Sequence, residues 1–276
     1  MVRDLLITGA SGFIGGALGQ HFSKKPHLRV WSIGKSDQAN SLTETIEAEK
    51  MVDFGILLNG WSGVEKKHSS DSNLQRASLR EFRLQVESVL KYKPKFIIGF
   101  GSQSELTLNQ SSDRPKSAYA QAKSEARSLL LDVCEKAEIK AHWLRIYSVY
   151  GQGMASSWIL PEVARAIRTN SQLELGRCTQ KWGFLHISDF CSAIEKIMNN
   201  SERLPFDIDV GGLANSSLKE QLTSLLEGMQ SKVLLFDESK DPEADSIPNL
   251  RPLLELGWEQ KVDLKTGFAE LVENAG

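Results

Sequence analysis

A glycine loop at the start of the chain constrains the fold more than any other feature. The apolar run Asp4–Thr8 leads into Gly9, Gly12 and Gly15, and a helical pattern spans Phe13–Phe22. The first glycine permits a sharp turn, the second lets the backbone approach a pyrophosphate, and the third lets helix and strand pack closely. The helix N-terminus offers N–H groups and the positive end of a dipole to phosphates. The pattern predicts a dinucleotide cofactor site, whose residues are Gly9, Ser11, Gly12, Phe13, Ile14 and Gly15. A glycine-rich turn without a ligand is the alternative.

Short apolar runs alternate with helical patterns through the first 150 residues. The expected strands are Asp4–Thr8, Leu28–Ile33, Phe54–Leu58, Lys95–Gly101 and Lys140–Tyr147. The expected helices are Phe13–Phe22, Ser72–Tyr92 and Lys116–Ala137. This alternation predicts an α/β fold with a Rossmann-type, doubly wound parallel sheet.

The pattern changes after Gly151, where shorter pieces follow one another. A helix is expected from Ser188 to about Asn199, with Asp189 as its N-terminal cap. We expect residues 1–150 and about 180–204 to form a domain that binds NAD(P). Residues of about 151–179 and 205–276 are expected to form a smaller, C-terminal part that binds substrate.

The composition excludes several classes of function. The chain has 33 Lys and Arg against 35 Asp and Glu, with a net charge of −2. This balance argues against a nucleic-acid partner and against a polybasic membrane surface. No apolar run reaches the roughly 18 residues of a membrane helix, and three scattered cysteines make neither a disulfide framework nor a metal cluster. We expect a cytoplasmic protein without a metal.

The end of the second expected strand bears on the choice of cofactor. Sites for NAD usually carry an acidic residue here, which binds the ribose 2′-hydroxyl. In this chain Lys35 and Ser36 follow Gly34, and the first acidic residue is Asp37. A lysine and a serine suit a 2′-phosphate, so we expect NADP rather than NAD, with a solvated loop lysine as the alternative.

A tyrosine and a lysine lie four residues apart in the strongest helical segment. Tyr119 and Lys123 therefore share one face of that helix. A nearby ammonium favours the phenolate and is expected to lower the pKa of Tyr119 from about 10. Such a pair is an acid/base device. An isolated Y-x-x-x-K is usually a surface feature, but this one follows a glycine loop.

Several further motifs combine with the glycine loop and the Tyr–Lys pair into one family pattern. They are Gly101-Ser-Gln-Ser-Glu105, Leu144-Arg-Ile-Tyr-Ser-Val-Tyr-Gly151, Gln180-Lys-Trp-Gly-Phe-Leu-His-Ile-Ser-Asp189 and Leu256-Gly-Trp258. Together they resemble the extended short-chain dehydrogenase/reductase family of nucleotide-sugar epimerases, dehydratases and ketoreductases. The resemblance covers nearly the whole chain.

The resemblance implies roles for three catalytic residues. Tyr119 would exchange the proton, Lys123 would hold the nicotinamide ribose, and Ser102 would bind the reacting oxygen. Both Tyr119 and Lys123 would thus also contact the cofactor. Ser104 competes with Ser102, because the Tyr-Gly that follows this stretch in the family is replaced by Leu106-Thr107.

Other departures point to a subgroup. Trp182 stands where the family often has arginine, and Trp61 follows the third strand in place of small residues. These features look most like ketoreductases that act on CDP- or dTDP-linked 4-keto-6-deoxyhexoses. Tryptophan faces stack on sugars or bases, with core packing as the alternative. We therefore expect Trp61, Ser104, Trp182 and Arg251 to contact the substrate. Arg251 is a candidate for binding a diphosphate, as are Arg177 and Lys181, with a solvated charge as the alternative for each.

The predicted function is NADPH-dependent reduction of such a nucleotide-linked keto-sugar in deoxysugar biosynthesis. An epimerase or dehydratase with tightly bound NAD is the first alternative, and a non-catalytic NADP sensor is the second. The resemblance also implies a homodimer formed through the helices at about 72–92 and 116–137.

Overall fold

The computed structural model describes residues 2–34, 38–62, 68–109, 117–227, 233–241 and 243–274. The chain divides into two compact units. The first comprises residues 1–146 and 195–208, and the second comprises residues 147–194 and 209–276. The sequence-based division placed about 180–204 with the first part, whereas the returning segment in the structure is 195–208.

A six-stranded sheet forms the centre of the first unit, in the order β10-β5-β4-β3-β1-β2. Its strands are β1 (Asp4–Thr8), β2 (Arg29–Ile33), β3 (Phe54–Leu58), β4 (Phe96–Phe100), β5 (Lys140–Ile146) and β10 (Asp207–Val210). Strands β1 to β5 pair in parallel. The predicted α/β fold with a Rossmann-type parallel sheet is therefore confirmed.

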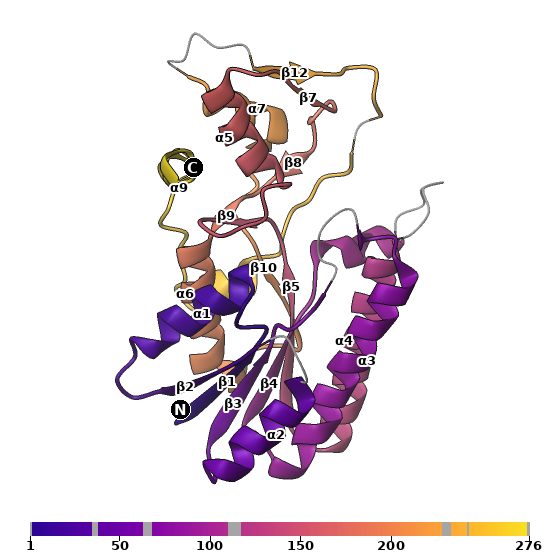
Figure 1. Cartoon of the computed structure of the whole chain (residues 1–276), viewed down its shortest axis with the longest axis vertical. Helices are drawn as coiled ribbons and strands as arrows, with labels where there is room; N and C mark the ends of the chain where they lie inside the picture. The colour runs from indigo at the N-terminus through magenta and orange to yellow at the C-terminus, as the bar shows by residue number, and fades with distance from the viewer. Residues whose placement is uncertain are drawn as a thin grey trace. The chain divides into compact units, whose positions relative to one another are not determined.

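Helices cover both faces of this sheet (Figure 1). They are α1 (Phe13–Ser23), α2 (Gln38–Ala48), α3 (Ser72–Val89), α4 (Ala118–Lys136) and the last turn of α6 (Ile187–Asn199). Helices α2, α3 and α4 lie on one face, and α1 lies on the other with the end of α6 (Figure 1). Glu195 of α6 accepts hydrogen bonds from His21 and Lys25, which ties α6 to the end of α1.

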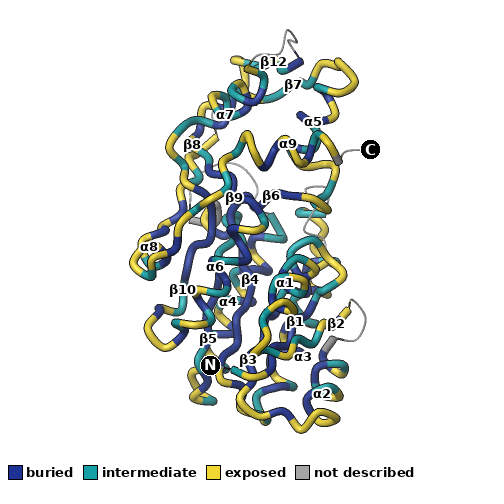
Figure 2. Tube along the Cα trace, turned by 90° about the vertical axis from the view of Figure 1, so that its left-hand side faces the viewer, coloured by how far each residue is buried: buried dark blue, intermediate teal, exposed yellow. Residues whose placement is uncertain are grey.

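The central strands of the sheet are buried along their whole length. Every residue of β1, β3 and β4 is buried. Strands β3 and β4 accordingly appear dark blue in Figure 2, whereas the helices carry exposed outer faces. Such continuous apolar runs are typical of parallel strands with helices on both faces. Burial on both faces leaves the loops at the strand ends as the place for polar chemistry.

Successive strands are added on opposite sides of β1, so the strand order reverses there. The chain passes from β1 to its neighbour β2, and then crosses to β3 on the other side of β1. Ligands of open α/β sheets bind at such a switch point, beyond the carboxyl ends of the strands. Helix α2, which the sequence analysis did not expect, makes the crossing from β2 to β3.

Small paired strands and helices build the second unit. The pairs are β6 (Val149–Tyr150) with β9 (Leu185–His186), β7 (Leu173–Leu175) with β12 (Leu234–Phe236), and β8 (Lys181–Trp182) with β11 (Ser216–Ser217). The helices are α5 (Ile159–Thr169), α7 (Leu218–Ser224), α8 (Arg251–Glu255) and α9 (Leu264–Asn274). Tyr150, Leu160, Phe184, Leu222 and Phe268 belong to one apolar core.

Asp189 does not cap α6, contrary to the prediction, because that helix begins two residues earlier, at Ile187. Its buried carboxylate accepts the backbone N–H groups of Lys261 and Val262, at 3.0 and 2.8 Å. Asp189 therefore fixes the chain that leads into α9.

Candidate active site

The glycine loop after β1 packs directly against the loop after β3. Gly9 has a φ of +65°, a conformation that side chains disfavour, and a Cβ there would lie 2.9 Å from the Cα of Gly60. A Cβ on Gly15 would lie 2.3 Å from the carbonyl oxygen of Gly9 and 2.9 Å from the side-chain nitrogen of Asn59. Both glycines are therefore required by close backbone approach.

The N-terminus of α1 is built to receive an anion. Gly12 is the N-cap, and it carries no side chain that could satisfy the first N–H groups of the helix. The first turn contains no acidic residue, so nothing in the helix itself opposes an anion. Ser11 lies exposed in the turn, and Phe13 and Ile14 open the helix. This cradle fits the phosphates of a dinucleotide. Lys35 and Ser36 lie outside the described residues.

Ser102, Tyr119 and Lys123 meet at the carboxyl end of β4. Ser102 follows this strand directly, and a side-chain hydrogen bond joins it to Tyr119 in the first turn of α4. Ser117 caps that helix by accepting the N–H of Ala120 at 3.1 Å. The structure thus brings together the three residues to which the sequence analysis gave catalytic roles.

The environment of Tyr119 changes one expectation. Burial raises the pKa of Tyr119 to about 12, and the negative charge of Glu105 acts in the same direction, while the Ser102 hydrogen bond opposes both. The predicted lowering of this pKa is therefore wrong, because desolvation of the phenolate outweighs the favourable contacts. The phenol keeps its proton at neutral pH.

The buried nitrogen of Lys123 lies beside a backbone carbonyl and two aromatic rings. Its Nζ donates to the carbonyl oxygen of Phe100 at 2.6 Å, and it lies 3.9 Å from the centre of the Trp61 ring and 5.9 Å from that of Tyr119. Burial lowers the pKa of Lys123 to about 7, and the charge of Glu105 opposes this shift. Lys123 consequently titrates near neutral pH.

Trp61 links this cluster to the glycine loop. It follows Asn59 and Gly60, the two residues against which the loop packs. Its indole N–H donates to Gln75 on α3 at 3.0 Å, which fixes the ring beside Lys123. Ser104 also belongs to the cluster, because its hydroxyl lies 3.2 Å from that of Ser102. The glycine loop, Trp61 and the three candidate catalytic residues are therefore contiguous.

Glu105 is a site residue that the sequence analysis did not single out. It is buried, and its carboxylate accepts the backbone N–H of Ser102 at 2.6 Å and the indole N–H of Trp143 at 3.0 Å. Ser102 and Glu105 have the spacing S-x-x-E, which is typical of a helix N-terminus. A 3₁₀ helix, Gln103–Asn109, begins there, and this spacing is the signal by which Glu105 could have been found.

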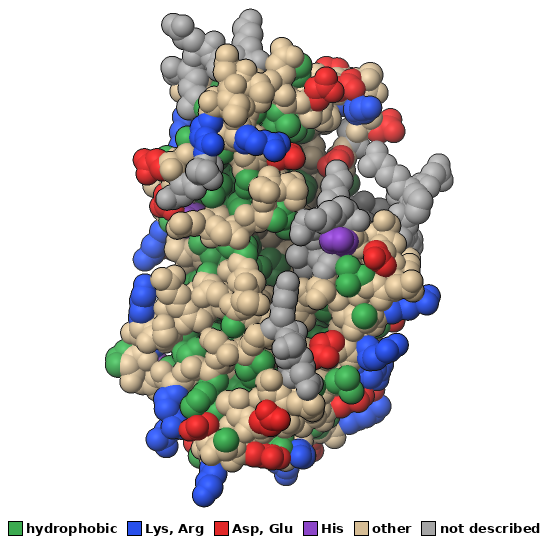
Figure 3. Space-filling view, viewed as in Figure 1, with side chains coloured by type: hydrophobic (Ala, Val, Ile, Leu, Met, Phe, Trp, Pro, Cys, Tyr) green, Lys and Arg blue, Asp and Glu red, His purple; other side chains and the backbone are tan. Residues whose placement is uncertain are grey.

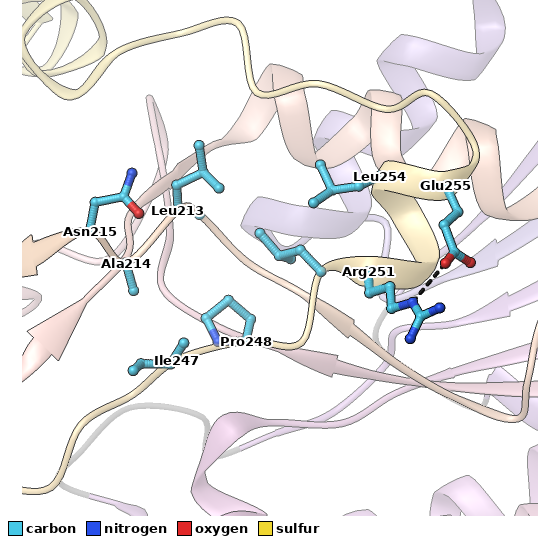
Figure 4. Close-up of a pocket in the computed structure, with 10 residues that line it drawn as sticks. Leu213, Ala214, Asn215, Ile247, Pro248, Arg251, Leu254 and Glu255 are labelled. Atoms are coloured by element: carbon cyan, nitrogen blue, oxygen red, sulfur yellow. Dashed lines mark hydrogen bonds and ion pairs between the residues drawn. The ribbon is translucent and has the colours of Figure 1, made fainter.

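The predicted contacts Trp182 and Arg251 belong to the second unit. Trp182 lies on β8, and its indole N–H is buried without a hydrogen-bond partner among the described residues. Arg251 opens α8, and its largely exposed side chain pairs with Glu255 at 2.7 Å (Figure 4). It lies on the rim of an open groove of about 530 Å³, with Leu213, Ile247 and Leu254 in the lining.

Other kinds of site lack support in the described parts of the chain. No group of three or more His, Cys, Asp or Glu side chains there is arranged to hold a metal ion. Among the same residues no helix is long and apolar enough to cross a membrane. Acidic and basic side chains are interspersed on the face shown in Figure 3, so the charges drawn there form no broad basic surface.

Comparison with known proteins agrees with this geometry. CDP-abequose synthase of Salmonella typhimurium is 24% identical, over 98% of this chain and 97% of its own length. UDP-glucuronic acid decarboxylase 1 of Arabidopsis thaliana is 23% identical, and the match covers 58% of this chain and 38% of that enzyme. The structure of RMD from Pseudomonas aeruginosa complexed with NADPH is 17% identical and superposes with a TM-score of 0.78, covering 100% of this chain and 98% of the other.

The family model for the NAD dependent epimerase/dehydratase family matches residues 5–211, which include the glycine loop, Ser102, Tyr119 and Lys123. The chain belongs to the NAD dependent epimerase/dehydratase family.

Proposed function

We propose that the protein reduces a nucleotide-linked 4-keto-6-deoxyhexose, a CDP- or dTDP-sugar, with NADPH, as a step of deoxysugar biosynthesis. The observation that supports this most is the contiguity of the cluster. Ser102 is hydrogen-bonded to Tyr119, and Lys123 lies against the ring of Trp61. Trp61 directly follows the two residues that pack against Gly9 and Gly15. A proton donor and a dinucleotide cradle thus share one end of the sheet.

The residues of this cluster divide the work of a carbonyl reduction. When bound, the reduced nicotinamide supplies the hydride. Tyr119 donates its phenolic proton to the carbonyl oxygen, and Ser102 orients that oxygen by a hydrogen bond. Lys123 holds the nicotinamide ribose and, as an ammonium, stabilises the phenolate that remains. A raised pKa suits Tyr119 to this direction, because the proton is present at neutral pH before the reaction.

The substrate class rests on the similar proteins and on four side chains. CDP-abequose synthase is a full-length relative, and its name refers to a CDP-linked sugar. In our proposal Trp182 offers the nucleotide sugar its indole N–H, which has no hydrogen-bond partner in the described part of the chain. Trp61 and Ser104 contact the sugar at the carbonyl end. Arg251 binds the diphosphate, which replaces Glu255 as its ion-pair partner.

NADPH is proposed over NADH because of the sequence that follows β2. Lys35 and Ser36 supply a cation and a hydroxyl where an acidic residue would favour NAD. RMD, which has a similar fold, was solved with NADPH.

The two parts of the chain receive separate roles in the proposal. Residues 1–146 with 195–208 bind the cofactor, and residues 147–194 and 209–276, which include Trp182 and Arg251, bind the nucleotide sugar. We place the enzyme in the cytoplasm, because Cys134, Cys178 and Cys191 are free, buried thiols suited to a reducing compartment.

We also propose a homodimer formed through α3 and α4. Leu84 on α3 is a large, exposed apolar residue that suits such a contact. Light scattering is expected to give twice the mass of one chain, and Leu84→Asp is expected to shift the protein toward monomer. A monomeric wild-type chain at micromolar concentration would remove this part of the proposal.

An epimerase or dehydratase that retains NAD is the second candidate. It is favoured by the acidic residue Glu105 next to Ser102, because such reactions need acid/base groups beyond one tyrosine. The carboxylate of Glu105 is bound to Ser102 and Trp143, however, which removes it from the role of a free base.

A substrate screen separates the candidates. The purified protein is incubated with NADPH or NADH and CDP-, dTDP-, GDP- or UDP-linked 4-keto-6-deoxy sugars, and absorbance at the nicotinamide band is followed. We expect stoichiometric oxidation of NADPH with a CDP- or dTDP-sugar. Copurifying NAD together with sugar conversion but no net oxidation would favour the epimerase or dehydratase, and binding of NADP without turnover of any sugar would favour a sensor.

A further inference from the structure

Glu105 is a buried carboxylate beside the candidate active site, and the proposed reaction does not use it. Only 7% of its surface is exposed. One oxygen accepts the N–H of Ser102 at 2.6 Å, and the other accepts the indole N–H of Trp143 at 3.0 Å. Burial of a carboxylate is costly unless hydrogen bonds and opposite charges compensate it, so this position needs an explanation.

The backbone around Glu105 is shaped to hold the carboxylate. A Cβ on Gly101 would lie 2.4 Å from its Oε1 and 2.3 Å from the indole nitrogen of Trp143. Trp143 is completely buried, and a Cβ on Gly99 would lie only 2.7 Å from its ring. Two glycines and a buried tryptophan thus fix where the negative charge lies.

Charged and titratable groups face Glu105 from two elements. On α4 they are Lys123, Tyr119 and Arg127, and on β5 it is Arg145. Arg127 is already bound to Asp207 through two nitrogens. Lys123 is buried, and the charge of Glu105 stabilises its ammonium form.

We propose that Glu105 is a positioning residue that fixes the backbone of Ser102 and, through its charge, favours the ammonium form of Lys123. This inference rests on the proposed function, because it gives Lys123 and Ser102 their roles in the reduction. Glu105 acts through these two residues and does not touch the substrate.

The electrostatics agree with the geometry. Burial lowers the pKa of Lys123 to about 7, and the charge of Glu105 acts against that shift. In return, Lys123 and Arg145 oppose the rise that burial causes in the pKa of Glu105. An opposite charge at close range shifts a pKa by about one unit or more. Loss of the Glu105 charge is thus expected to lower the pKa of Lys123 by about one further unit.

A purely structural role makes a different prediction. Ser102 and Glu105 form half of a capping box, and an uncharged glutamine also accepts the Ser102 N–H in that arrangement. Glu105→Gln therefore removes the charge and keeps one acceptor oxygen, because Oε1 accepts the Ser102 N–H and also lies 3.2 Å from the indole nitrogen of Trp143. Glu125→Gln is the matched control, because it removes a carboxylate from an exposed position of α4.

The first readout needs no substrate. The protein is labelled with ¹³C at the lysine ε-carbon, and the Lys123 signal, assigned from its loss in Lys123→Met, is followed with pH. We expect a midpoint near pH 7 in the wild type and in Glu125→Gln, and a midpoint about one unit lower in Glu105→Gln. Equal midpoints in the wild type and Glu105→Gln would overturn the proposal, even if no sugar is ever turned over.

The second readout is the pH profile of NADPH oxidation. The alkaline limb of activity is expected to move to lower pH in Glu105→Gln by the same amount as the Lys123 midpoint. If Glu105→Gln does not fold, the double variant Glu105→Gln, Lys123→Met decides. Recovery of folding when both charges are removed supports the pairing, and failure to recover contradicts it.

Discussion

The ammonium of Lys123 lies 3.9 Å from the centre of the Trp61 ring. An aromatic face attracts a cation, and the contact is strongest when both groups are shielded from water. The indole N–H of Trp61 is held by Gln75, so the ring orientation is set from α3. Trp61 therefore stabilises the charged form of Lys123, in addition to any contact it makes with a substrate.

Trp61→Leu is expected to reduce stability in a pH-dependent way. The substitution removes the cation–π contact, about 0.5 to 2 kcal/mol, only where Lys123 is charged. Its cost in unfolding free energy is therefore expected to be larger at pH 6 than at pH 9. Denaturant titrations at both values measure this, and Trp61→Phe, which keeps a ring, serves as the control. Equal costs at the two pH values would show that the ring does not sense the charge.

Tyr119→Phe is expected to lower kcat by about 10²- to 10⁴-fold, because it removes the proton donor and leaves the ring in place. Binding of NADPH, followed by fluorescence, is expected to stay within about twofold of the wild type, since the glycine loop is untouched. Tyr92→Phe, in the short helix after α3, is the matched control. Turnover near the wild-type rate in Tyr119→Phe would rule out the proposed mechanism.

The pH dependence of stability follows from Lys123. Its pKa is about 7 in the folded protein and 10.5 as an ordinary value. Between these values the unfolded chain binds the extra proton, so the free energy of unfolding rises with pH, by up to about 1.4 kcal/mol per unit. Below pH 7 Lys123 is charged in both the folded and the unfolded protein, so the full free-energy cost of burying its ammonium lowers the stability. The raised pKa of Tyr119 acts in the opposite direction, but only above pH 10.

Lys123→Met isolates this contribution. The difference in unfolding free energy between the wild type and Lys123→Met is measured at pH 6, 7, 8 and 9 by denaturant titration. We expect a constant difference below pH 7 and a steady gain for the wild type above it. A difference that stays flat to pH 9 would mean that Lys123 keeps its proton in the folded protein.

The sequence predicted the buried strands closely, because continuous apolar runs bounded by turns leave few alternatives. Asp4–Thr8 and Phe54–Leu58 have the observed limits. Helix α2 was not expected, because it is mostly polar and only residues such as Leu42 and Ile46 mark its buried side.

The candidate site was predictable in residue identity but not in electrostatics. The spacing of Tyr119 and Lys123 placed them on one face of α4, and the motif after β4 supplied Ser102. The sign of the Tyr119 pKa shift depends on how deeply the phenol is buried and on the charge of Glu105, which no local spacing reveals. The contact of Asp189 with Lys261 likewise joins residues far apart in the chain.

Gly15→Ala tests whether the glycine loop is the cofactor cradle. A Cβ at this position would lie 2.3 Å from the carbonyl oxygen of Gly9 and 2.7 Å from its carbonyl carbon. Both are backbone atoms, so the loop must shift, and overpacking of this kind costs about 1 to 3 kcal/mol. We expect NADPH affinity to fall at least tenfold in a protein that still folds, measured by fluorescence titration and circular dichroism.

Gly16→Ala is the matched control in the same helix. A Cβ there would lie 3.3 Å from the carbonyl oxygen of Ala10, a contact that small adjustments relieve. Alanine is also the better helix former, by about 1 kcal/mol. Gly16→Ala is thus expected to keep its NADPH affinity within about twofold of the wild type. Because the two variants add the same methyl group one residue apart, equal NADPH affinities in both would show that the close approach at Gly15 does not shape the cofactor site.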